Sequence, residues 1–209
     1  DLDMIQNYQY ERTMSLNKPI KFGFVRGPVW NFGDEDMKHG IEEFVKNAQL
    51  DIEELDLGKD FDDAAKAHEI IMNGSIANSL MNYYQTDKSN LHPFTVKRIE
   101  AGIPVSASDY VSAIEQAKKM EQILKQFFKK YDAIITPAAP GQAPRDLMNT
   151  GNAIFNGYWT MMGVPAISLP FLKGKDDLPI GIQFIANWSE DLKLLEICKY
   201  ILKKEKLAN

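Results

Sequence analysis

Apolar residues along this chain follow two spacings in turn, one typical of strands and one typical of helices. In the stretch KPIKFGFVRGP, Ile20, Phe22 and Phe24 share one side of a strand that ends at a Gly-Pro pair. Helical spacing follows over residues 36–48, and DIEELDL then alternates as a second strand. The chain therefore opens with the order strand, helix, strand.

The middle of the chain is predicted to be helical. Residues 61–84 have a broad apolar side, although Gly74 interrupts the pattern and argues against one straight helix. A short helix is expected over residues 95–101. The strongest helical pattern covers residues 106–130 and begins with Ser-x-x-Asp, which is similar to a capping box.

The last third returns to strands. Residues 131–136, YDAIIT, predict a buried strand that runs into a proline-rich loop, and residues 151–162 fit either a short helix or an irregular loop. GVPAISLP and LPIGIQFIA then predict an antiparallel hairpin. A final helix is expected to start near Ser189. Its inward residues are expected to be Leu192, Leu195, Cys198 and Leu202.

This alternation predicts an α/β fold, in which helices sandwich a mixed β-sheet. With 209 residues, of which 44% are apolar and 25% charged, the chain has the composition of a globular domain. Residues 1–209 are therefore expected to form a single unit. The opening DLDMIQNYQY has no initiator methionine and no strand or cap signal, so we expect it to continue a longer polypeptide.

Charge and cysteine content exclude several classes of function. The net charge is −5 with acids and bases intermixed, which argues against nucleic acid as the main ligand. No apolar run reaches membrane-spanning length and no signal peptide is visible, so a cytoplasmic protein without membrane contact is expected. Cys198 is the only cysteine, which rules out an internal disulfide and favours a core role for that residue.

Local motifs give no catalytic apparatus. The chain has no Gly-Gly pair and no Gly-x-Ser-x-Gly elbow. His39, His68 and His92 lie in three separate segments, where each is expected on the surface or at a helix cap, so neither a metal site nor a cofactor is predicted. The acidic pair Asp176 and Asp177 falls in a turn, where solvation explains it.

Three stretches of the last third carry a family resemblance. In order and spacing, the closing segments of amidase signature enzymes resemble YDAIITPAAPGQAP, NGYWTMMGVPAISLP and LPIGIQFIANWSEDLKLLEICKYI. That family has a Tyr-Asp strand ending in a proline loop, a Thr-x-x-Gly-x-Pro-Ala strand, and a Pro-x-Gly-x-Gln strand before its last helix. SASDYVSAIEQAKKMEQIL resembles the family's long helix, and KPIKFGFVRGPVW resembles the strand that follows its signature region. The resemblance covers nearly the whole chain, with specific motifs from about Asp109 onward.

The resemblance implies an amidohydrolase that cleaves a carboxamide through an acyl-enzyme. The family uses a serine nucleophile, a bridging serine on a cis peptide and a neutral lysine base, all in its N-terminal half. This sequence resembles only the portion after that half, so no residue here inherits a catalytic role. The chain alone is predicted to be inactive, with the N-terminal half of the same enzyme and a small amide as its partners. A homodimer is compatible with this interpretation.

The resemblance also implies substrate-binding residues. Arg98 in VKRIEAG resembles an arginine that contacts the substrate carboxylate in glutamine-handling members, although the sequence favours an arginine on the helix surface, since many relatives with uncharged substrates need no such contact. Phe155 and Trp159 lie where the family's pocket wall approaches the substrate, and either a pocket or a core role fits these aromatics. Gln183 is expected to be a hydrogen-bonded structural amide.

The loop over residues 137–144 is predicted to form a stiff rim beside the catalytic face, because its prolines reduce the entropy lost when substrate binds. Two other functions stay open. One is a non-catalytic relative that binds a partner or a small amide. The other is an unrelated α/β domain that binds a small molecule, which the strand-helix-strand start alone allows.

Overall fold

A mixed sheet of five strands organises the protein. The computed structural model describes residues 19–146 and 148–208, so the opening residues discussed above lie outside the described part. The strand order is β2-β1-β3-β5-β4. The strands β1 and β2 are parallel, β1 and β3 are parallel, and β5 runs antiparallel to both β3 and β4. The strands are β1 (Lys21–Phe24), β2 (Asp51–Glu54), β3 (Ala133–Pro137), β4 (Ala166–Lys173) and β5 (Pro179–Ile185).

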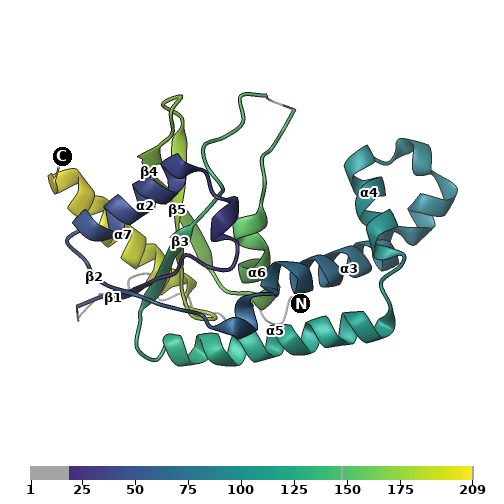
Figure 1. The fold of residues 1–209 in the computed structure, drawn as a ribbon, viewed down its shortest axis with the longest axis horizontal. Helices are drawn as coiled ribbons and strands as arrows, with labels where there is room; N and C mark the ends of the chain where they lie inside the picture. The colour runs from purple at the N-terminus through teal and green to yellow at the C-terminus, as the bar shows by residue number, and fades with distance from the viewer. Residues whose placement is uncertain (1–18, 147, 209) are drawn as a thin grey trace.

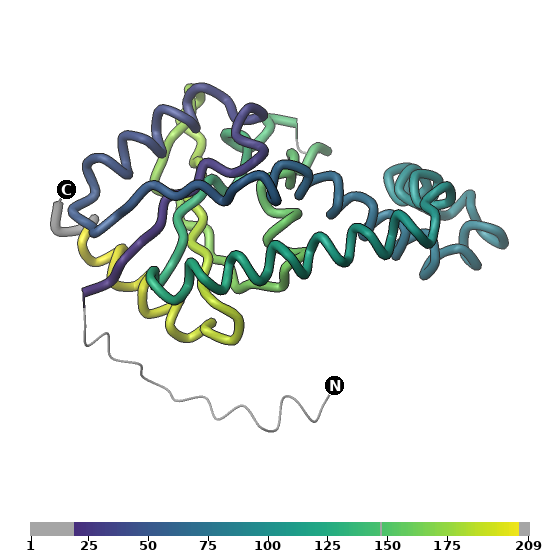
Figure 2. Tube along the Cα trace, turned by 60° about the horizontal axis from the view of Figure 1, so that its bottom comes forward, coloured from purple at the N-terminus to yellow at the C-terminus, as the bar shows by residue number. Residues whose placement is uncertain are grey.

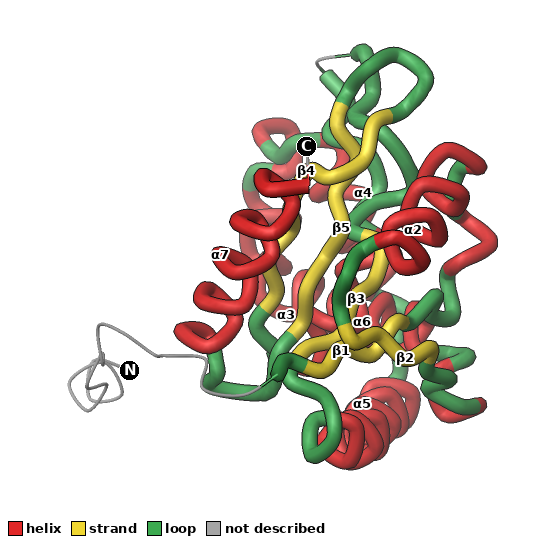
Figure 3. The backbone as a smooth tube through the Cα atoms, turned by 90° about the vertical axis from the view of Figure 1, so that its left-hand side faces the viewer, coloured by secondary structure: helices red, strands yellow, loops and turns green. Residues whose placement is uncertain are grey.

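Helices cover both faces of the sheet. In Figure 3, α2 and α7 lie on the near face, and α3, α5 and α6 lie behind it. The helices are α2 (Glu35–Asn47), α3 (Ala64–Thr86), α4 (Pro93–Gly102), α5 (Ala107–Phe127), α6 (Ile154–Met162) and α7 (Asp191–Ala208). The predicted α/β architecture with a sandwiched mixed sheet is confirmed. None of the helices within the described residues has the length and apolar character needed to span a bilayer.

The core is built on the alternation that the sequence shows. Phe22 and Phe24 are buried on β1, and Phe22 meets Phe184 of β5 edge to face at 6.5 Å between ring centroids. On the face that α2 covers, Phe44 stacks on Phe171 of β4 with centroids 5.4 Å apart. β3 is buried along its whole length, because it is the middle strand and both of its faces are covered.

Two expectations about helices are wrong. Gly74 does not break α3, which continues through it because Tyr110 of α5 packs there: a Cβ atom at Gly74 would lie 3.0 Å from the Tyr110 ring. In α7 the inward stripe differs from the predicted one. Leu195 and Leu202 are 46% and 36% exposed, and the stripe at helical spacing that meets the sheet is Leu194, Ile197, Cys198 and Ile201.

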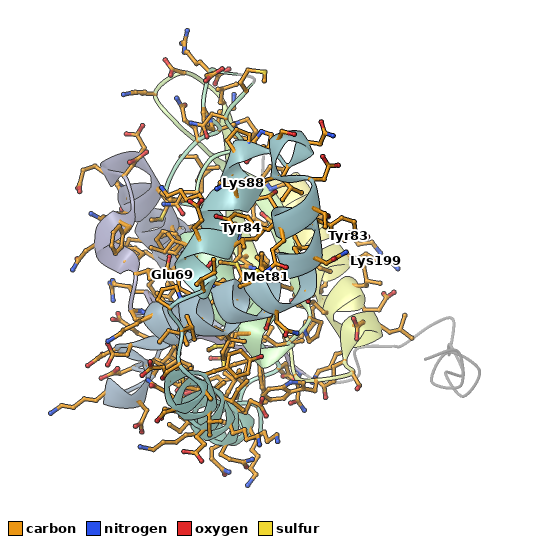
Figure 4. All side chains as sticks on the ribbon, turned by 90° about the vertical axis from the view of Figure 1, so that its right-hand side faces the viewer. Glu69, Met81, Tyr83, Tyr84, Lys88 and Lys199 are labelled. Atoms are coloured by element: carbon orange, nitrogen blue, oxygen red, sulfur yellow. The ribbon has the colours of Figure 1, made fainter. Side chains whose placement is uncertain are left out.

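A helical arm extends away from the sheet. We use this name for the far half of α3, all of α4 and the first turns of α5, which Figures 1 and 2 show projecting from the sheet layers. Figure 4 views the arm end-on, with Tyr84 and Lys88 side by side. Both residues bond to Glu100 of α4, at 2.9 and 2.8 Å, which holds α4 against the end of α3.

The Tyr-Asp pair at the start of β3 anchors the sheet. The backbone N–H of Lys21 donates to Asp132 Oδ2 at 3.1 Å, and the Asp132 N–H donates to the Lys21 carbonyl at 2.8 Å. Asp132 Oδ1 lies 3.2 Å from Lys193 Nζ of α7. The Tyr131 hydroxyl donates to Glu53 of β2 at 2.6 Å. The pair therefore ties β3 to β1, β2 and α7.

We expect Asp132→Asn to reduce the free energy of unfolding by about 2 kcal/mol, because it leaves the largely buried Lys193 ammonium with Glu190 as its one carboxylate partner within the described residues and removes the charge that accepts from β1. Urea unfolding followed by circular dichroism measures the change. Glu196→Gln removes an exposed ion pair with Lys199 on the same helix and is expected to cost about 0.5 kcal/mol or less. Equal effects of the two substitutions would refute the anchoring role of Asp132.

Candidate functional site

The carboxyl ends of β1 and β3 form the natural place for a site. β1 and β3 are parallel neighbours in the sheet. The chain leaves β1 through α2, which lies on one face of the sheet, and it enters β3 from α5, which lies on the other face. Ligands of open α/β sheets bind where such connections diverge. The loop that the sequence predicts as a rim leaves β3 at this edge, and α6 follows it.

α6 begins against that loop. Asn152 Oδ1 accepts the Ile154 N–H at 3.0 Å, and Asn156 Nδ2 donates to the Ala138 carbonyl at 3.1 Å, which ties the first turn of α6 to the end of β3. The helix ends at Gly163, whose φ of 67° is left-handed. The segment that fits either a helix or a loop in the sequence is therefore a helix from Ile154.

The predicted aromatic residues both lie on α6. Phe155 and Trp159 are one turn apart and are 0% and 1% exposed, and both belong to the main core cluster. Tyr158 lies against Trp159, with ring centroids 4.7 Å apart. In the described residues both side chains are therefore part of the core.

A polar cluster lies beneath α6. A Cβ atom at Gly27 would approach the Tyr158 hydroxyl to 2.6 Å, so this hydroxyl reaches the carboxyl end of β1. Burial raises the pKa of Tyr158, and nearby Thr136 and Trp159 oppose that shift. Among the residues described, the side-chain oxygens of Tyr158 and Thr136 have no hydrogen-bond partner of normal geometry. The same is true of Gln183 Oε1, contrary to the expectation of a fully bonded amide.

Arg98 lies on the arm. Its helix α4 is capped by His92, whose Nδ1 accepts the Phe94 N–H at 3.2 Å. The guanidinium is held loosely: Nη1 is 3.4 Å from Asn73 Oδ1 and 3.8 Å from Glu69 Oε1, and the group lies 5.0 Å from the Phe94 ring centroid. With 29% of its side chain exposed, Arg98 retains donors that can bind an anion.

His68 connects Arg98 with α6. Gly157 lies between the predicted aromatics, and a Cβ atom there would lie 2.6 Å from His68 Nδ1, so the imidazole packs directly on the backbone of α6. Burial lowers the pKa of His68, Glu69 raises it, and the positive charge of Arg98 lowers it again. The ring is therefore neutral at pH 7 and can donate or accept a hydrogen bond. His68 also borders a hollow of about 440 Å³ between α3, α5 and α6.

The sequence prediction placed His68 on the surface, and the structure shows it half-buried. His92 caps α4 and His39 is exposed, as expected. Cys198 is buried, and burial raises the pKa of its thiol to about 12, which makes it unreactive. In the part of the chain that the structure describes, no three His, Cys, Asp or Glu side chains gather as metal ligands would.

Comparison with known proteins gives a consistent result. A family model described as Amidase matches residues 3–195. A glutamyl-tRNA(Gln) amidotransferase subunit from Aliarcobacter butzleri is 34% identical over 54% of this chain and 28% of its own length. The corresponding protein of Listeria welshimeri is 25% identical over 94% of this chain and 50% of its own length. A fatty acid amide hydrolase of Medicago truncatula is 35% identical over 41% of this chain and 16% of its own length.

A solved structure described as an amidase matches with a TM-score of 0.77 at 17% identity, covering 88% of this chain and 45% of that one. This likeness concerns the fold. The chain spans about half or less of the length of these relatives.

The electrostatic link between Arg98 and His68 can be tested by titration. We expect the pKa of His68 to lie below its ordinary value of 6.5, to rise in Arg98→Gln and to fall in Glu69→Gln, because the two neighbours act with opposite signs. NMR titration of the imidazole measures all three values. If neither substitution moves the His68 pKa, Arg98 does not belong to the same cluster.

Proposed function

Because the chain belongs to the amidase family, we propose that it forms the C-terminal portion of an amidase signature amidohydrolase. Residues 1–209 act as one unit of that enzyme. The observation that supports this most strongly is the family match over residues 3–195 together with a fold that covers less than half of a solved amidase. The substrate is a small molecule with a carboxamide group.

The reaction proceeds through a serine ester. A serine hydroxyl attacks the amide carbonyl, the C–N bond breaks and the amine leaves with a proton, and water then releases the acid and the free serine. The resemblance implies that this serine, the bridging serine and a neutral lysine lie in polypeptide that precedes residue 1. A neutral lysine at pH 7 requires burial that lowers its pKa.

This chain contributes the wall and scaffold of the site. The buried aromatics of α6 fix the position of the helix, and Arg98 offers a guanidinium toward a substrate carboxylate. The imidazole of His68 packs on the backbone of α6, and burial and the positive charge of Arg98 lower its pKa. The rim over residues 137–144 lies at the carboxyl end of β3 and limits how substrate enters.

Because the proposed catalytic residues lie outside residues 1–209, this chain alone is expected to be inactive. The purified 209-residue protein is expected not to hydrolyse simple amides and not to be labelled by a serine-directed fluorophosphonate, because no serine of the described residues bonds to a histidine or lysine base, and the Ser75 and Ser106 hydroxyls bond to Tyr110 and Asp109. Intact-mass spectrometry after incubation with the probe measures labelling. A heat-denatured sample reports nonspecific reaction. Stoichiometric labelling of the folded chain alone would contradict the proposal.

The role of Arg98 predicts substrate-dependent kinetics. In the complete gene product, Arg98→Gln should raise KM about 10- to 100-fold for an amide that carries a free carboxylate, which is the loss expected for a hydrogen bond to a charged group. KM for an uncharged amide should stay unchanged. Lys97→Gln removes a neighbouring exposed charge as the matched control. An equal rise in KM for both substrates in Arg98→Gln would assign Arg98 a structural role only.

A further inference from the structure

The loop after β3 is held by polar contacts at both of its sides. We call residues 138–145 the strap. On the side of α2, the Asp34 N–H donates to the Pro140 carbonyl at 2.7 Å. The Asp34 carboxylate fills the space beside Gly141, where a side chain on that residue would overlap it. A side chain at position 141 would therefore force the Asp34 carboxylate to move.

On its other side the strap is bound by one carboxylate from the turn between β4 and β5. Gln142 Nε2 donates to Asp176 Oδ2 at 2.5 Å, and Arg145 Nη2 donates to Asp176 Oδ1 at 2.6 Å. The Asp176 N–H returns a bond to Gln142 Oε1 at 3.1 Å. Asp176 therefore accepts from two strap side chains with its two separate oxygens.

The turn that carries Asp176 is itself fixed. The Lys175 N–H donates to Asp36 Oδ2 of α2 at 2.9 Å, and the Asp177 N–H donates to the Gly174 carbonyl at 2.9 Å. Arg145, followed by Gln142, lowers the pKa of Asp176, so the carboxylate is ionised at neutral pH. A rigid turn thus presents a charged acceptor to the strap.

The strap crosses a hollow instead of packing on the core. The hollow measures about 630 Å³ and lies between residues 33–36, the strap residues Gln142 to Arg145, and the turn residues Lys175 and Asp176. Ala143, Pro144 and Arg145 are exposed. Polar contacts, and not buried apolar surface, hold this end of the strap. The strap can therefore move without opening the core.

We propose that the carboxylate of Asp176 is a latch that keeps the strap closed over this hollow. Breaking the latch opens the strap while the sheet stays folded. The inference rests on the contacts above and is independent of the proposed amidase activity.

Hydrogen–deuterium exchange of the protein, in its wild-type form and as Asp176→Asn, tests the latch. Loss of the charge weakens the bonds from Gln142 and Arg145, so the amides of residues 34 and 176, which donate to Pro140 and Gln142 of the strap and report its opening, should exchange at least about 10-fold faster. Protection of β3 and β5 should stay unchanged. Trypsin should cleave after Arg145 faster in Asp176→Asn, because the guanidinium is released from its partner.

Asp177→Asn is the matched control. This neighbouring residue has the same charge, pairs only with Lys173 among the ion pairs of the described residues, and has a φ of 62°, which asparagine tolerates. It should leave exchange of the two reporting amides and cleavage of the strap within about twofold of wild type. Three results would overturn the latch: unchanged exchange of these amides in Asp176→Asn, equal opening in Asp177→Asn, or a parallel loss of protection in β3 and β5.

Discussion

The buried carboxylate of Asp132 sets the position of the central strand, and the rest of the molecule is arranged around that strand. Its two oxygens meet a backbone N–H of β1 and the ammonium of Lys193 on α7, so the sheet and the helix that closes it are joined at one point. A buried charge needs such partners, because its desolvation costs several kcal/mol. From this anchor β3 runs through the core and delivers the strap and α6 to the carboxyl edge of the sheet.

Local patterns were sufficient to predict the elements of the fold. Alternation identified β1 and the β4–β5 hairpin, and helical spacing identified α2 and α5, because each depends on residues close together in sequence. The failures depended on distant residues. Gly74 looks like a helix breaker until the Tyr110 ring of α5 is placed against it. On α7, two apolar stripes that share Cys198 have similar spacing, and only contact with the sheet decides which one is buried.

The candidate site was harder to predict, since it depends on pairs far apart in the chain. Arg98 was identified only through family resemblance, and nothing local indicated that His68 packs on α6, where burial and the charge of Arg98 lower its pKa. Gly157 was the one available signal, because a glycine within an aromatic helix indicates close approach by another group. Asp176 looked like a solvated turn residue, and its two partners on the strap are more than 30 residues away. Phe155 and Trp159 fit either a core or a pocket role in the sequence, and both are buried in the described chain.

Together these features describe a scaffold: a rigid wall, a charged group for orientation and a latched strap. Among the described residues, no serine or cysteine side chain bonds to a histidine or lysine base. The claim that the reactive serine lies in preceding polypeptide can be tested by locating the covalent adduct. The complete gene product would be trapped with a slowly turned-over amide analogue and its labelled peptide sequenced by mass spectrometry. We expect an adduct on a serine upstream of residue 1, and an adduct on any serine within residues 1–209 would refute the proposed position of the nucleophile.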